Sequence, residues 1–282
     1  MLNNMEKPSE RALRIVEEIC RRTACDHYRL ILNEERTPSI TDSKIGGKPF
    51  WPIDKDYPVD EQGQPMLMVM QVNCSDTKLK APLPEAGMLQ WFISTDPEYM
   101  YGCRGNYDEN GSGFRIIYHE TVDQNKLLDS VPSHDSVDNE LSPVKREVAI
   151  DVVEEQTVMN VSDGHFNRLF FEIVKEITGV DHSGKKWYEY LDNEDGLNFE
   201  QNLGMKRPRH QMLGYPYFDQ DDARRDIERN DILLFQLASQ HSTIDRKELV
   251  MWGDMGNGFI FINHSDLALR DFSHAYYCWD CG

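Results

Sequence analysis

The alternation of apolar and polar positions predicts a chain built mostly from β-strands. Val148, Ile150 and Val152 alternate with polar neighbours, which is the pattern of a strand with one face in water. The segments MLMVMQVN (66–73) and DILLFQLAS (231–239) are almost continuously apolar, so we expect central strands buried on both faces. The predicted strands are 66–73, 88–93, 113–119, 146–154, 231–238, 247–252, 257–263 and 274–280.

Apolar residues at helical spacing predict two longer helices. The first covers 9–22 with Ser9 as its N-cap, and the second follows Ser162 and Asp163 and ends at Gly179. Shorter helices are predicted at 185–191 and 219–229. The apolar stripes are Leu13, Val16, Ile19 and Cys20 in the first helix and Leu169, Phe170, Ile173, Val174 and Ile177 in the second.

Two stretches of the chain share a run of glycine, proline and aromatic residues, SKIGGKPFWP (43–52) and HQMLGYPYF (210–218). In each part an apolar strand with an internal glutamine follows, and then an apolar strand led by a glycine. These residues are Gln71 and Gly87 in the first part and Gln236 and Gly258 in the second. The shared order predicts an internal duplication, in which residues 207–280 repeat the pattern of roughly 40–120. Chance is the alternative, because Gly-Pro turns before strands are common.

The order of these elements predicts four parts within one compact globular unit. They are an N-terminal helical segment (1–34), a first β-rich half (35–160), a helical connection (161–206) and a second β-rich half (207–282). The segment 129–143 has two prolines and several Ser and Asp residues, which indicates a loop or linker.

The acidic composition narrows the classes of partner. The 282 residues include 49 acidic and 30 basic side chains, a net charge of −19. Such a surface repels phosphate backbones, so we expect no nucleic-acid partner, and it attracts basic proteins. No apolar run reaches the length of a membrane span and the N-terminus lacks a secretory signal, so we expect no membrane partner and a cytoplasmic location. Solubility alone explains the same charge.

The candidate metal sites are incomplete. Cys278 and Cys281 have the CxxC spacing of half a zinc site, and two small hydrophobes on a C-terminal strand are the alternative. Asn106, Asp108 and Asn110 match the first half of a calcium loop, but Ile117 stands where the closing glutamate belongs. A hairpin tip explains that run equally.

The sequence predicts no cofactor and contains no complete catalytic motif, so no catalytic residue is predicted and enzymatic activity stays open.

The repeated motifs, together with APLPEAGMLQWFI (81–93) and WGDMGNGFIFI (252–262), resemble the YwqG-like family of uncharacterised bacterial proteins over about residues 35–280. The resemblance implies a compact α+β fold rich in antiparallel strands, here β-rich with two similar halves, an N-terminal helix and a mid-chain helix. It implies no established reaction, cofactor or catalytic residue. Some relatives are associated with toxin–immunity gene neighbourhoods. The segment 129–143 and the CWDC tail depart from the family pattern, so neither takes meaning from it.

Two hypotheses of function follow. The first is a cytoplasmic binding protein, an acidic immunity-type inhibitor of a basic toxin or another basic protein. The second is an enzyme or small-ligand protein with a cleft between the two repeats. The candidate ligand-binding residues are Trp51, Gln71, His210, Tyr215, Gln236, Trp252 and Asp254. For the two glutamines, internal hydrogen bonding that fixes the core is the competing interpretation.

Overall fold

The computed structural model describes residues 9–105, 107–108, 111–133, 141–182, 184–191, 199, 203 and 210–282. The described helices are α1 (Glu10–Thr23), α2 (Cys74–Thr77), α3 (Phe166–Thr178), α4 (Trp187–Tyr190) and α6 (His264–Leu269). The described strands are β1 (Cys25–Asn33), β2 (Lys44–Ile45), β3 (Leu67–Asn73), β4 (Met88–Ile93), β5 (Tyr107–Asp108), β6 (Phe114–His119), β7 (Val148–Thr157), β8 (His210–Leu213), β9 (Ile232–Ala238), β10 (Gln240–His241), β11 (Glu248–Val250), β12 (Asn257–Ile262) and β13 (Tyr276–Asp280).

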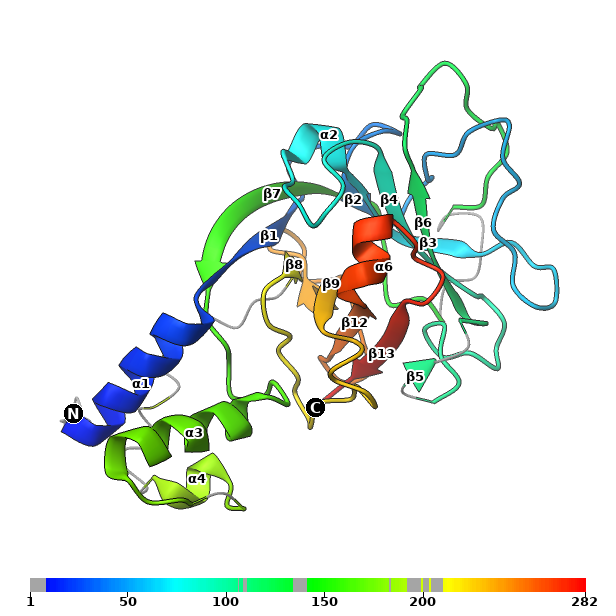
Figure 1. The fold of residues 1–282 in the computed structure, drawn as a ribbon. Coiled ribbons are helices and arrows are strands. Elements are labelled where there is room, and N and C mark those ends of the chain that lie inside the picture. The colour runs from blue at the N-terminus through cyan, green and yellow to red at the C-terminus, as the bar shows by residue number, and fades with distance from the viewer. Residues whose placement is uncertain are drawn as a thin grey trace.

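One large antiparallel sheet dominates the molecule and is nearly closed into a barrel (Figure 1). Its strand order is β5-β13-β12-β9-β8-β1-β7-β2-β3-β4-β6, while β10 and β11 form a separate pair. The sheet curls until the end strand β6 approaches β13, the strand next to the short end strand β5, because the rings of Phe114 on β6 and Tyr277 on β13 lie 5.3 Å apart. We call the line between β6 and the chain that leads into β13 the seam.

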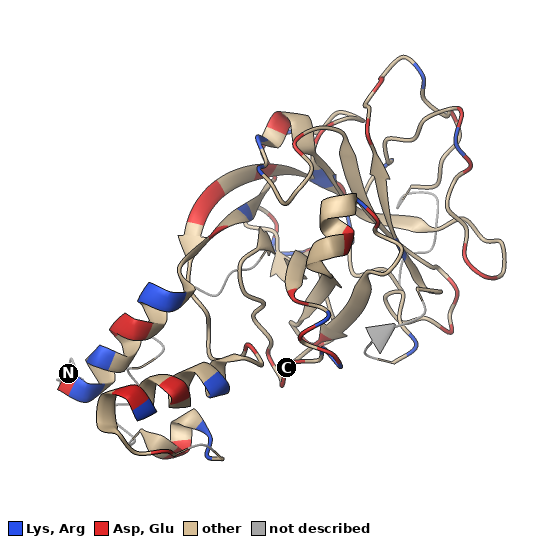
Figure 2. Ribbon diagram, in the orientation of Figure 1, with Lys and Arg blue, Asp and Glu red and all other residues tan. Residues whose placement is uncertain are grey.

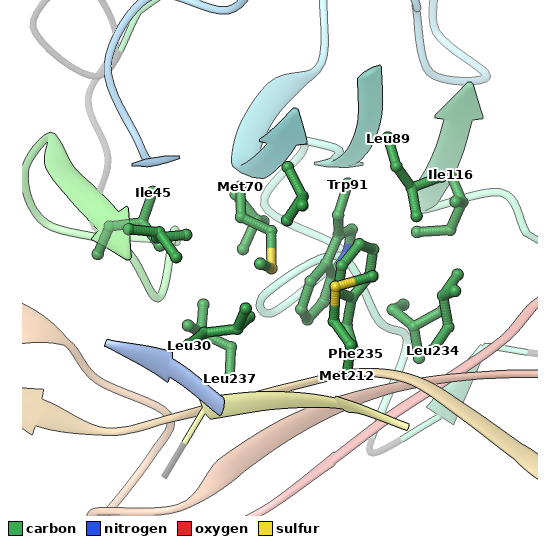
Figure 3. Close-up of a cluster of buried hydrophobic side chains, with 14 of the residues drawn as sticks. Leu30, Ile45, Met70, Leu89, Trp91, Ile116, Met212, Leu234, Phe235 and Leu237 are labelled. Carbon is green, nitrogen blue, oxygen red and sulfur yellow. The ribbon is translucent and has the colours of Figure 1, made fainter. Parts of the chain in front are cut away.

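The main hydrophobic core fills the inside of the curled sheet. Figure 3 shows Leu30 of β1, Met70 of β3, Trp91 of β4 and Phe235 of β9 pointing into this shared interior. On the opposite face of the sheet, smaller apolar clusters form under the loops, because neighbouring residues on a strand point to opposite sides. The continuously apolar β3 and β9 are buried on both faces, as predicted.

The two sides of the sheet are arranged alike around the β1–β7 pair. Moving outward, β1 is followed by β8, β9, β12 and β13, and β7 is followed by β2, β3, β4 and β6. The pairing of β3 with β4 skips Val69, and the pairing of β9 with β12 skips Leu234. Each skipped residue therefore forms a β-bulge two positions before the glutamine of its strand.

The helices α1, α3 and α4 pack together beside the sheet around their own apolar cluster (Figure 1). Ser9 caps α1 through its hydroxyl, and Gly179 ends α3 with φ 72°, both as predicted. The predicted stripe of α1 is wrong at Leu13, which is 40% exposed, because Ala12 and Ile15 complete the buried face instead. No helix within the described residues has both the length and the apolar character needed to cross a bilayer.

The eight predicted strands are confirmed with shifts of a few residues at their ends, but β1 and the short β2, β5, β8 and β10 were not predicted. The helix predicted at 219–229 is wrong, because this segment forms turns. Its polar groups form other hydrogen bonds instead. The amides of Asp219 and Gln220 donate to Asp280, and Arg224 donates to Asp163 and Asp222. These contacts replace helical hydrogen bonds.

A matched pair of leucine substitutions tests where the core lies. Leu237 is fully buried in the main core, whereas Leu269 at the end of α6 is 78% exposed. We expect Leu237→Ala to lower the free energy of unfolding by about 2–5 kcal/mol, since it leaves a cavity. Leu269→Ala is expected to stay within about 0.5 kcal/mol of the unsubstituted protein. Urea unfolding of both variants is the measurement, and equal losses would contradict the assignment.

Candidate functional site

The two glutamines hold the segments after the repeated prolines against the sheet. Gln71 Oε1 accepts from the Phe50 amide at 2.9 Å, and Gln236 Oε1 accepts from the Tyr217 amide at 3.0 Å. A second glutamine supports each one, because Gln90 donates to Gln71 and Gln211 donates to Gln236. Gln71 and Gln236 thus bond within their own halves and not to each other. Ligand binding by these two residues stays a prediction.

His210 and Tyr215 also have internal partners. His210 Nδ1 accepts from the Ala238 amide at 3.1 Å, and its Nε2 lies 2.9 Å from Gln240 Oε1. The accepting Nδ1 places the proton of the neutral ring on Nε2. Tyr215 donates to the Thr23 carbonyl at the end of α1, and burial raises the pKa of its hydroxyl. The hydrogen bonds of His210 and Tyr215 thus link separate segments of the fold.

Trp51, Trp252 and Asp254 lie in different surroundings. Trp51 belongs to the outer cluster with Phe92, while Trp252 is in the main core, stacked on Trp91 at 5.6 Å. Asp254 is exposed. Gln71 holds Phe50, and the rings of both Phe50 and Trp51 contact His119.

The candidate metal residues are not brought together. Cys278 on β13 packs in an outer cluster, whereas Cys281, just after the end of β13, packs against the main core on the other side of the sheet. Asn106, Asn110 and the side chain of Asp108 lie outside the described residues. Within the part of the chain that the structure describes, no three His, Cys, Asp or Glu side chains are grouped to hold a metal ion.

A pocket of about 740 Å³ lies at the seam of the sheet, and we call it the seam pocket. Strand β6 and the residues after it form one wall, the end of α6 and the chain that follows form the second, and the loop after Trp51 forms the third. The lining residues are Pro52, Asp54, Lys55, Arg115, Ile116, Ile117, Tyr118, His119, Glu120, Thr121, Leu269, Arg270, Phe272 and Ser273.

Basic side chains outnumber acidic ones around the seam pocket. Lys55, Arg115 and Arg270 line it, against Asp54 and Glu120. None of the three cations forms an ion pair with a carboxylate of the described residues: Arg115 donates to the carbonyls of Gly111 and Phe114, and Arg270 lies over the ring of Tyr118. A cationic pocket on a chain of net charge −19 is a local reversal of charge.

His119 is the buried polar side chain of the seam pocket. It is 1% exposed and its ring packs edge-on against Trp51 at 4.9 Å and Phe50 at 5.6 Å. Neither ring nitrogen has a hydrogen-bond partner among the described residues. Burial is the main cause that lowers the pKa of His119 to about 4; the Lys55 charge contributes to this lowering and Asp54 opposes it. The ring is therefore neutral at pH 7, with one donor and one acceptor free.

Sequence reasoning missed the seam pocket for an identifiable reason. The segment FRIIYH (114–119) was predicted as a strand, but nothing in it indicates that the strand lies at an edge of the sheet. Arg270 comes from a helix end more than 150 residues later. Only the curling of the sheet brings these segments together.

The fold and the seam pocket define a β-rich protein whose antiparallel sheet is nearly closed into a barrel. The chain belongs to the family described as "Domain of unknown function (DUF1963)", whose model matches residues 43–281. This match includes every residue that lines the seam pocket. No curated protein matches the chain.

Removing either glutamine is expected to destabilise the protein. Gln71→Ala and Gln236→Ala each leave an amide hydrogen of the segment after a proline without its acceptor, a loss of about 1–3 kcal/mol in the free energy of unfolding. Gln62→Ala, at an exposed position, is the matched control and should change little. Chemical unfolding compares the three. A silent Gln71→Ala would mean that its hydrogen bonds do not stabilise the fold.

The pKa of His119 predicts a pH-dependent loss of stability. Because its folded-state pKa of about 4 lies below the unfolded value of 6.5, the folded chain binds fewer protons between these values. The free energy of unfolding therefore falls as the pH drops through this window, by about 2–3 kcal/mol between pH 7 and 4.5. His119→Phe removes this contribution while keeping a ring. Urea unfolding at both pH values should show a smaller fall in the variant, and equal falls would refute the assignment.

Proposed function

We propose that this protein is a non-enzymatic binding protein that takes the anionic part of a ligand into the seam pocket. The observation that carries this proposal is the set of three basic side chains without carboxylate partners among the described residues, Lys55, Arg115 and Arg270, in a chain of net charge −19. Unpaired cations beside apolar walls attract anions and lose part of their hydration there. His119 lines the same pocket, and its ring lies buried behind the wall with no hydrogen-bond partner for either nitrogen among the described residues.

We further propose that the chain arose by internal duplication, in line with the resemblance to the YwqG-like family. Three observations support it: the matching strand order on the two sides of the sheet, the β-bulges at Val69 and Leu234, and the glutamine-to-amide hydrogen bonds of Gln71 and Gln236. On this proposal β1 begins the first repeat and β7 begins the second, and the two strands are exchanged in the sheet, because β1 pairs with β8 and β7 pairs with β2.

A second candidate function is that of an acidic immunity-type inhibitor of a basic toxin or another basic protein. The net charge of −19 favours it. Figure 2 shows Asp and Glu residues spread over α1, α3, β7 and the loops around the barrel rather than on one element. A basic partner would therefore be attracted from several directions, and its association rate would fall as salt rises.

Thermal-shift measurements with simple anions test the seam pocket. The probes are inorganic phosphate, acetate and citrate, added to the full chain at low ionic strength. A probe at 100 times its dissociation constant raises the stability of the folded state by about 2.7 kcal/mol. We expect Arg115→Gln and Arg270→Gln each to reduce the shift.

The matched control is Arg21→Gln on α1, at a side chain that is 67% exposed and paired with Glu18 outside the seam pocket. It should leave the shift unchanged. A flat response of the unsubstituted protein to all three anions, or an equal loss in Arg21→Gln, would contradict binding at the seam pocket.

A further inference from the structure

The seam pocket follows the edge of strand β6. It contacts every residue from Arg115 to Thr121, although neighbouring side chains of a strand point to opposite faces of the sheet. Only a pocket that lies beside the edge of β6 can contact the side chains on both faces of the strand. Within the described residues, β6 pairs with β4 and with no other strand, so this edge is open.

The register fixes which backbone groups of β6 face the pocket. The Ser94 amide donates to the Gly113 carbonyl, which makes Ser94 and Gly113 a hydrogen-bonded pair. Such pairs alternate with non-hydrogen-bonded ones in an antiparallel ladder. In the observed register, Ile116 pairs with Trp91 and Tyr118 with Leu89, both at non-hydrogen-bonded positions. The amides and carbonyls of Ile116 and Tyr118 therefore point away from β4 and toward the seam pocket.

The wall opposite β6 is apolar and basic. Leu269 is 78% exposed there, and Phe272 packs against the ring of Tyr118 at 6.0 Å. Arg270 lies on this wall, while Arg115 projects from β6 itself and Lys55 from the loop after Trp51. A strand placed in the pocket thus meets cations on more than one side and an exposed apolar side chain.

We propose that the occupant of the seam pocket is an extended peptide segment with acidic side chains, which adds to β6 as a further antiparallel or parallel strand. This inference rests on the proposed function and names the class of its ligand. The backbone of the peptide bonds to Ile116 and Tyr118, and its carboxylates meet Lys55, Arg115 and Arg270. Backbone pairing supplies affinity without sequence preference, and the basic side chains select acidic segments.

Three sets of fluorescent hexapeptides test this inference by fluorescence anisotropy with the full chain. In the first set Glu alternates with Val or Thr, in the second Lys replaces Glu, and the third repeats the first with alternate backbone amides methylated. We expect the Glu set to bind at least about tenfold more tightly than the Lys set, with an affinity that falls as salt rises. Backbone methylation should weaken binding by at least about tenfold, because it removes strand hydrogen bonds while keeping the charges.

A substitution on β6 tests the same backbone contact from the protein side. Ile116→Pro removes an amide hydrogen that faces the pocket and spares the bonds to β4, as proline is tolerated at the open edge of a strand. Ile116→Ala is the matched control, since it loses the same side chain and keeps the amide. We expect only Ile116→Pro to lose binding of the Glu set. If Ile116→Pro fails to fold, the methylated peptides decide.

The outcomes separate this inference from the proposed function. If simple anions bind but the Glu set does not, strand addition is overturned and an anion pocket remains. The same holds if the Glu set binds equally well with and without backbone methylation. Binding of the Lys set at equal strength overturns the acidic ligand class. No response to any anion or peptide overturns both.

Discussion

The antiparallel pairing of β1 with β7 holds the two sides of the sheet together. It runs along the whole of β1, from Cys25 opposite Thr157 to Asn33 opposite Ala149. On either side of this pair lie β8 and β2, the strands that lead into the two glutamine-held segments. Without it the sheet would separate into two smaller sheets with exposed edges, which are marginal in water. The long pairing therefore positions both glutamines and the curl of the sheet.

The same curl explains why a cationic pocket exists on an acidic protein. The sheet ends at β6 on one side, and the end of α6 reaches that edge from the other without pairing with it. Arg115 and Arg270 therefore line one pocket from its two sides. The support behind it is rigid, because Gln71 holds Phe50, and Phe50 and Trp51 pack on His119. A buried hydrogen bond thus supports the wall of the seam pocket indirectly, through the packed rings of Phe50, Trp51 and His119.

Local sequence patterns predicted most of the strands, because alternating or continuous apolar runs indicate burial directly. The predictions failed where contacts with distant parts of the chain determine the local structure. In the segment 25–33 the buried Tyr28, Leu30 and Leu32 alternate with half-buried residues, but the apolar Ile31 interrupts the polar pattern and the predicted helix lies just before it, so the strand was not predicted. The charges of 219–229 matched a helix, but the buried Arg224 pairs with Asp163 from another part of the chain. The ligand residues predicted from the repeated motifs lie in several different surroundings, because the sequence does not show which face of the sheet each tryptophan or glutamine occupies.

An open edge strand is a hazard for a protein, because its unpaired amides and carbonyls recruit strands of other chains. Charged side chains usually guard such an edge, and Arg115 and Arg270 have that effect against basic or neutral segments. They do not repel an acidic one. Because the side chains at this edge are basic on a chain of net charge −19, the edge that repels basic segments still attracts carboxylates. Protection from aggregation and selection of a ligand are then two results of one arrangement of charges at the seam.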